Sequence, residues 1–256
     1  RFNFSSSYPY EFTSLTASPF KWLEATYRYT EIKTELYGPS QYSGNQTLKD
    51  KGFDLKALVN KETYFLPAIS IGLRDIAGTG MFSSEYIVSS KKLGNLDLSV
   101  GLGWGILGTD NNFSNPLNSF HEGFKTRDDS LGQGGTFSFK NWFSGNTAIF
   151  GGIEYDLPKT GLRLKLEYDT SNPDDRNTVD DLKSRFNLGF NYSFSENLSF
   201  SSSYERGSKF RIAFKLKGNF LNDTIPKPRP KTVQNLDEDQ KSKIREDNSI
   251  FYRSLN

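Results

Sequence analysis

The chain has 256 residues, of which 32 are basic and 30 acidic, and it contains no cysteine. This length is enough for one large β-domain or two small ones. The lack of cysteine excludes disulfides and cysteine-based metal sites, and the near balance of charge gives no overall case for a nucleic-acid partner. Phe, Tyr and Gly are abundant, at 22, 13 and 22 residues, which favours strands and tight turns over helices.

Alternation of apolar and polar residues with a period of two dominates the chain. It is clearest at 96–104, 162–168, 186–194 and 210–216, where every second residue is apolar. Successive side chains of a strand point to opposite faces, so each segment has one apolar and one polar face. No stretch of the sequence approaches the roughly 18 consecutive apolar residues that a transmembrane helix needs.

Twelve segments are predicted as strands. In chain order they are 2–8, 20–32, 52–59, 67–75, 81–91, 95–106, 134–141, 147–156, 162–170, 185–194, 197–206 and 209–219. Many have the roughly 9–11 residues that cross a bilayer at a tilt. Several of the joints between them are short, whereas 33–51 and 107–133 are long connections, and such a mixture is typical of outer-membrane barrels.

The same alternation also fits a soluble β-sandwich or soluble barrel, whose apolar faces would turn inward. Two features favour the membrane. The polar face carries full charges, as at Arg163, Lys165 and Glu167, and the apolar face of the same strands is uninterrupted. We therefore predict an all-β fold, an antiparallel transmembrane β-barrel of about 12 strands over 1–220, in a bacterial outer membrane. Its lipid-facing residues are predicted to include Leu188, Phe190, Phe214 and Leu216.

Aromatic residues lie mostly near the predicted strand ends or on apolar faces. Their rings prefer the level of the lipid headgroups, so we expect two interfacial bands. The residues concerned are Trp22, Tyr27, Tyr29, Trp104, Trp142, Tyr155, Tyr168, Tyr192 and Tyr204.

The composition changes after Phe220. Pro226, Pro228 and Pro230 alternate with basic residues, a pattern typical of a stiff extended linker. The charged stretch 235–256 could open a small α-helical or α/β element. We predict a second unit at 221–256, a Pro-rich linker and the start of a periplasmic element, and expect the barrel to be one module of a longer protein.

Catalytic and metal-binding patterns are poor in this sequence. His121 is its single histidine and lies in a long connection, with no nucleophile motif such as G-x-S-x-G. One histidine cannot form a histidine-based metal site. Gly101, Gly103 and Gly105 alternate within a strand, so we interpret them as making room in the lumen or letting the strand bend. We expect no enzymatic activity, no cofactor and no metal.

The polar faces of the strands would line the lumen and are the remaining candidates for chemistry. One strand carries a basic stripe, and neighbouring strands add cations and acids. The cations are Lys209, Arg211, Lys215 and Lys217 in the stripe and Arg163, Lys165 and Arg185 beside it; the acids are Glu154, Asp156, Glu167 and Glu205. These charges could form a paired network that only holds the barrel shut, or a ligand-binding wall for an anionic polymer.

Several short motifs resemble, in this order along the chain, the YjbH family of outer-membrane proteins. The motifs are Gly52–Lys56, Pro67–Ala68, Gly72–Asp75, Gly78–Tyr86, Gly101–Gly105, Phe150–Tyr155, Leu164–Asp169 and, beyond the barrel, Arg245–Tyr252. Members of this family are encoded with exopolysaccharide and group 4 capsule functions and are thought to carry two barrels joined by periplasmic elements. The resemblance spans roughly 20–220 and implies a non-enzymatic protein, with no catalytic residue to carry over.

The expected function is that of an outer-membrane β-barrel module assisting secretion or surface assembly of an exopolysaccharide or capsule. Its expected partners are outer-membrane lipid, an anionic polysaccharide and other capsule or exopolysaccharide secretion proteins. The alternative is a passive structural or diffusion barrel, porin-like, with no polysaccharide partner. An outer-membrane hydrolase is a third hypothesis, which the single histidine disfavours.

Overall fold

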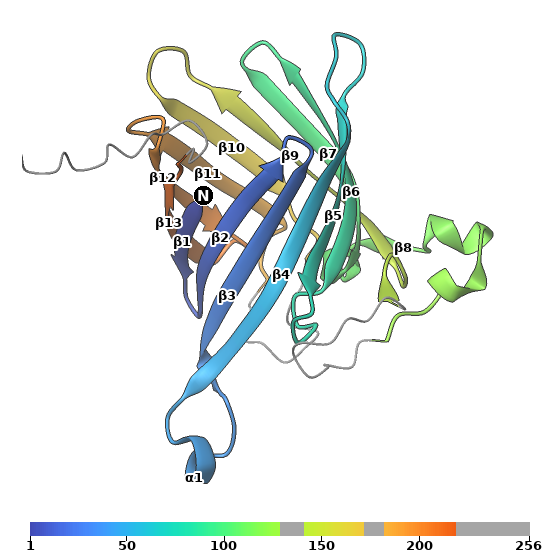
Figure 1. Ribbon diagram of the computed structural model, residues 1–256, viewed down its shortest axis with the longest axis vertical. Coiled ribbons are helices and arrows are strands. Elements are labelled where there is room, and N and C mark those ends of the chain that lie inside the picture. Colours follow the sequence, from blue (N-terminus) through green and yellow to red (C-terminus); the bar gives the residue numbers. More distant parts are fainter. Residues whose placement is uncertain (129–140, 172–181, 219–256) are drawn as a thin grey trace, which may run out of the picture. The chain divides into compact units, whose positions relative to one another are not determined.

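The computed structural model describes residues 1–128, 141–171 and 182–218. Twelve of the thirteen strands in these residues form a closed antiparallel barrel (Figure 1), which confirms the predicted fold. Each barrel strand pairs with the barrel strands before and after it, and the last pairs with the first. The short strand β8 stands apart from this order and pairs with one end of β9.

The barrel strands follow one another around the barrel in chain order. The barrel strands are β1 (Phe2–Ser7), β2 (Tyr10–Phe20), β3 (Leu23–Leu36), β4 (Thr47–Asn60), β5 (Ala68–Ile76), β6 (Ser84–Leu93), β7 (Leu96–Gly105), β9 (Thr147–Asp156), β10 (Leu162–Tyr168), β11 (Phe186–Ser193), β12 (Leu198–Glu205) and β13 (Lys209–Leu216), and β8 is Asn112–Phe113. In the part of the chain that the structure describes, helical structure is confined to α1 (Ser40–Ser43) and three 3₁₀ turns at Ile106–Gly108, Pro116–Ser119 and Glu122–Phe124. No helix in the described residues is long and apolar enough to cross a membrane.

The two ends of the barrel differ in the length of their connections. The end at which β1 begins carries short connections, and we call it the turn end; the opposite end is the loop end. The turn end has the connections 21–22, 61–67, 94–95, 157–161 and 194–197. The loop end has 37–46, 77–83, 106–146 and 169–185, with tight turns at 8–9 and 206–208. In Figure 1 the turn end is at the top, and α1 marks the loop end at the bottom.

The exterior of the barrel is apolar, as the alternation predicts. Leu188 and Phe190 on β11 are 58% and 37% exposed, and Phe214 and Leu216 on β13 are 48% and 53% exposed. Their neighbours in the chain point the other way: Asn187 is only 7% exposed and bonds to Glu167 of β10. The apolar side chains therefore cover the outside of the barrel, and the polar ones face the lumen.

A small apolar core lies inside the barrel toward the loop end. We call it the lumen cluster; it consists of Tyr10, Phe12, Ile32, Leu48, Met81, Phe82 and Ile106. Met81 and Phe82 belong to the connection 77–83, and the Phe82 ring lies 6.2 Å from the rings of Tyr10 and Phe12. Apolar side chains on the inner face are the exception to the pattern on which the strand predictions rest.

Strand β2 was not predicted, and the lumen cluster explains why. Tyr10 and Phe12 face inward and join the cluster, whereas Leu15, at 60% exposed, lies on the exterior. The apolar side chains thus change face within one strand, and the period of two is lost. The predicted segment 134–141 lies, apart from its last residue, outside the described residues. The predicted linker and periplasmic element at 221–256 lie outside them as well.

The predicted aromatic bands are partly seen. Near the turn end Trp22, Tyr155 and Tyr192 are 52%, 43% and 39% exposed, and near the loop end Tyr204 is 40% exposed. Trp104 contradicts the prediction, since it is 1% exposed and packs edge-on against Phe143, with ring centroids 5.1 Å apart. Connection 106–146, which contains Phe143, covers the loop end of β7 and so removes Trp104 from the exterior.

Candidate functional site

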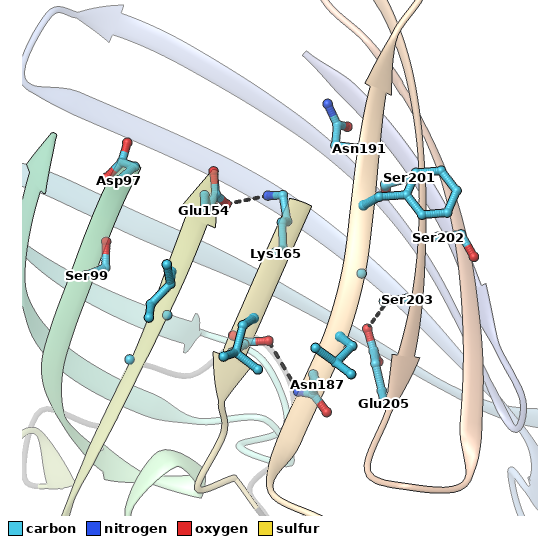
Figure 2. Close-up of a pocket in the computed structure, with 18 of the residues that line it drawn as sticks. Asp97, Ser99, Glu154, Lys165, Asn187, Asn191, Ser201, Ser202, Ser203 and Glu205 are labelled. Atoms are coloured by element: carbon cyan, nitrogen blue, oxygen red, sulfur yellow. Dashed lines mark hydrogen bonds and ion pairs between the residues drawn. The ribbon is translucent and has the colours of Figure 1, made fainter. Parts of the chain in front are cut away.

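A cavity of about 470 Å³, lined by both polar and apolar residues, lies in the lumen between β6, β7 and β9–β13. Figure 2 shows its walls, with acidic, amide and hydroxyl side chains pointing in from successive strands. We call it the lumen cavity. Its polar lining consists of Ser90, Asp97, Ser99, Glu154, Lys165, Glu167, Asn187, Asn191, Ser201, Ser202, Ser203, Glu205 and Lys215.

Glycines on the inner face make room for the one aromatic ring that reaches into this space from β9. A Cβ on Gly101 would lie 2.5 Å from Cζ of Phe150, and one on Gly103 would lie 2.5 Å from Cβ of Leu107. Phe150 lines the cavity and meets Tyr86 edge-on, with ring centroids 6.1 Å apart. The interpretation of Gly101 and Gly103 as spacers is confirmed, because a side chain at either position would collide with a neighbour. Gly105 differs, since it is the last residue of β7 and has a φ of 65°.

Two of the predicted site residues, Arg163 and Lys165 on β10, belong to an ion-pair network with β9. Arg163 Nη1 lies 2.9 Å from Glu154 Oε2 and its Nε lies 2.5 Å from Asp156 Oδ1. Lys165 Nζ lies 2.5 Å from Glu154 Oε1, so both cations have carboxylate partners on the neighbouring strand. The side chains are about one third exposed, so solvent screening leaves each pair a small contribution to stability.

The predicted basic stripe divides along β13. Lys209, Arg211 and Lys215 face inward, whereas Lys217 comes after the last residue of β13. Arg211 Nε lies 2.8 Å from Glu205 Oε1, and its guanidinium carbon lies 5.1 Å from the centre of the Phe12 ring. The Lys209 ammonium lies 5.3 Å from the centre of the Tyr10 ring. The loop-end half of the stripe is therefore attached to the lumen cluster.

Arg185 is not part of the lumen cavity. It precedes the first residue of β11 and forms an ion pair with Asp110 in connection 106–146, at the loop end. This bond to a carboxylate raises the pKa of the Arg185 guanidinium above its ordinary value. The sequence prediction placed Arg185 on a strand because the predicted segment 185–194 begins one residue before β11.

Three side chains in the cavity wall keep unused hydrogen-bonding capacity. Within the described residues, no hydrogen bond or ion pair joins the side chain of Asp97, Asn191 or Lys215 to another residue. In the strand register, Lys215 stands between Asn3 of β1 and Ser199 of β12, neither of which is acidic. A carboxylate, an amide and an ammonium group thus line the same cavity.

Two buried ion-pair groups were missed by sequence reasoning. Arg28 on β3 lies among Asp50 and Asp54 of β4 and Asp75 of β5, and Arg127 pairs with Glu85. Asp50 and Asp54 are spaced to share the inner face of one strand, which is the signal that could have been used for the first group. The second group depends on a long connection whose path alternation does not predict.

His121 lies where it was expected, in a loop. It is exposed, and its Nδ1 accepts a hydrogen bond of 2.9 Å from the backbone N–H of Gly123. It therefore caps the short 3₁₀ turn that begins at Glu122.

Comparisons with known proteins place the chain in a family. It is 42% identical over 226 residues to the "Uncharacterized lipoprotein YjbH" of Escherichia coli (strain K12), which covers 88% of this chain and 32% of that protein. The chain thus spans about a third of the length of this curated relative. Among solved structures it is similar to "KdgM porin" with a TM-score of 0.44 and 8% identity, over 85% of this chain and 98% of that one. It is also similar to a mutant of the Rh. blastica porin with a TM-score of 0.32 and 7% identity, over 82% of this chain and 55% of that one.

Both structural likenesses are distant, and neither bears on function. The model of the family described as "YjbH: Exopolysaccharide biosynthesis protein YbjH" matches residues 1–255. This match covers nearly the whole chain and confirms the resemblance seen in the short motifs. The chain belongs to the YjbH family, which is linked to exopolysaccharide biosynthesis.

Proposed function

We propose that this chain is an outer-membrane β-barrel that assists the secretion or surface assembly of an exopolysaccharide. The observation that carries the proposal is a closed barrel with an apolar exterior and, in its lumen, a cavity into which polar side chains point. The family description, which names exopolysaccharide biosynthesis, supplies the class of polymer. The name of the curated relative, a lipoprotein, supports a place at a membrane.

The exterior supports a position in a lipid bilayer. Large apolar side chains such as Leu188, Phe210 and Leu216 are 58%, 71% and 53% exposed, and a water-soluble protein rarely exposes so continuous a surface. Burying such surface in lipid is favourable by about 25 cal/mol per Å². Outer-membrane barrels carry short turns on the periplasmic side, so we place the turn end there and the loop end outside the cell.

The lumen cavity is the part of the barrel that we propose contacts the glycan. Sugar hydroxyl groups both donate and accept hydrogen bonds, and Asp97, Asn191 and Lys215 offer an acceptor, an amide and a donor that no described residue uses. Phe150 adds an apolar ring to the same wall. An acidic glycan would be attracted mainly through Lys215, because Arg163, Lys165 and Arg211 already have carboxylate partners.

The proposal is tested in cells that lack the protein and receive it back as variants. A double variant, Asn191→Ala with Lys215→Gln, removes two of the free polar groups from the cavity. We expect less glycan at the cell surface, with the barrel still folded as judged by its heat-dependent mobility in gels. Lys217→Gln is the matched control, because it removes the same charge beyond the end of β13.

A normal level of surface glycan in the folded double variant would reject the role of the lumen cavity. A passive diffusion barrel would instead show unchanged surface glycan together with free passage of small solutes into liposomes.

A further inference from the structure

The connection 77–83 turns into the barrel and reaches across it. It joins β5 to β6, yet Phe82 packs against Tyr10 and Phe12 of β2, which lies three strands away from β5 in the sheet. Met81 and Phe82 are each 7% exposed. A connection that merely linked neighbouring strands would have no reason to bury two large apolar side chains inside the lumen.

Arg28 on β3 holds this connection from the barrel wall. Its Nη2 lies 3.4 Å from Asp75 Oδ1 and 3.9 Å from Asp50 Oδ2, and its Nε lies 3.6 Å from Asp54 Oδ1. The guanidinium carbon also lies 4.9 Å from the centre of the Phe82 ring. One cation, itself 5% exposed, therefore contacts both the acids of the wall and the tip of the connection.

The same acids bind the connection directly. The Thr79 hydroxyl donates a hydrogen bond of 2.7 Å to Asp50 Oδ1, and the backbone N–H of Phe82 donates one of 3.1 Å to Asp75 Oδ2. A Cβ on Gly78 would lie 1.8 Å from Asp75 Oδ1, so the chain approaches this carboxylate as closely as only glycine permits.

Not all buried polar atoms of this arrangement have a hydrogen-bond partner. Within the described residues, the side-chain nitrogens of Arg28, Oδ2 of Asp50 and Oδ1 of Asp75 are buried without a hydrogen bond. Three carboxylates share one guanidinium, and no group of acids in the same residues is arranged to hold a metal ion. Buried polar atoms without hydrogen bonds destabilise the state that contains them, which lowers the free-energy cost of leaving that state.

We infer that the connection 77–83 is a plug that closes the lumen at the loop end, and that Arg28 latches it in place. Movement of Met81 and Phe82 out of the lumen would open a path past β2 and β3 for a polymer chain. This inference rests on the proposed role in glycan secretion, since it names how passage through the barrel is controlled.

The test uses two readouts on the whole chain reconstituted in lipid bilayers. The first is ionic current in Arg28→Gln, compared with wild type and with Arg206→Gln. Arg206 is also a largely buried loop-end arginine, but it contacts Ser171 and Asp169. Arg28 makes charge-assisted contacts that stabilise the closed state. Their loss in Arg28→Gln should raise the population of the open state, and with it the current, about tenfold. Thr79→Val serves as a second, milder variant that breaks the bond to Asp50.

The second readout uses the absence of cysteine from the chain. Met81→Cys introduces a single thiol in the lumen cluster, and we expect a thiol reagent to label it about tenfold faster when Arg28→Gln is also present. Equal current and equal labelling in wild type, Arg28→Gln and Thr79→Val would overturn the latch. Faster labelling without added current would overturn the plug, because the connection would move without controlling passage. Neither readout involves glycan. The proposed function is tested separately, by the amount of glycan at the cell surface.

Discussion

Glu85 and Arg127 form a buried ion pair that fastens connection 106–146 to the barrel. Arg127 Nη1 lies 2.7 Å from Glu85 Oε2, and the two side chains are 6% and 2% exposed. Glu85 Oε2 also accepts a hydrogen bond of 3.0 Å from the backbone N–H of Phe143. Because Phe143 packs on Trp104, the pair holds the loop that buries this tryptophan.

Breaking this pair is expected to loosen the loop end. Arg127→Met leaves Glu85 buried without its cation, and such a loss destabilises a protein by about 3–5 kcal/mol. Unfolding by denaturant in detergent micelles, followed by tryptophan fluorescence, measures the change. Trp104 emission should also shift to the red, since its cover is released.

Lys33→Gln, which removes an exposed pair with Glu11, is the control and should cost less than about 1 kcal/mol. Equal losses in the two variants would contradict the role of burial.

The facing of β11 predicts opposite results at alternate positions. Leu188→Arg puts a charge on the lipid side and should cost about 2–4 kcal/mol if the residue lies near mid-membrane. Asn191→Arg puts the same side chain into the lumen cavity, which acids such as Glu154 also line. Insertion into liposomes, scored by protection from protease, should fall only for Leu188→Arg. Asn187 is a poorer control than the alternation suggests, because it is 7% exposed and accepts a hydrogen bond from the backbone of Arg206. Similar insertion of both variants would refute the assigned facing.

Alternation of residues predicts most of the barrel but not its loop end. Where the exterior meets lipid and the interior meets water, as on β11 and β13, the two faces differ in polarity and a period of two follows. That contrast fails at Tyr10 and Phe12, which face inward onto apolar neighbours, and at Trp104, which faces outward beneath a loop. The partners responsible, Phe82 and Phe143, come from connections whose paths no strand pattern encodes. The paired cations Arg163 and Lys165 could be placed on a face, but their partners required the register of β9 against β10.

Close packing inside the lumen is expected to make Gly72 sensitive to its neighbour on β6. A Cβ on Gly72 would lie 2.0 Å from Cζ of Tyr86, which pairs with it in the register. Gly72→Ala should therefore lower the free energy of unfolding by about 1–3 kcal/mol through overpacking. Tyr86→Leu removes the obstructing atoms, so the double variant should lose less than the sum of the two single variants. Additive losses in this cycle, measured by denaturant unfolding, would show that the two residues do not interfere.

The unpartnered ammonium of Lys215 predicts how glycan binding depends on salt. An acidic glycan fragment entering the lumen cavity would meet Arg163 and Arg211 already engaged with acids, whereas no hydrogen bond or ion pair joins the Lys215 side chain to a described residue. Lys215→Gln should weaken binding of such a fragment about two- to fivefold at low ionic strength, the range of a partly exposed ion pair. At about 1 M salt, where the screening length is roughly 3 Å, the difference from wild type should shrink.

Fluorescence anisotropy with a labelled fragment measures both affinities, and Lys217→Gln serves as the matched control. A fragment that loses affinity equally at low and high salt would mean that Lys215 contributes packing or hydrogen bonding and no net attraction for charge.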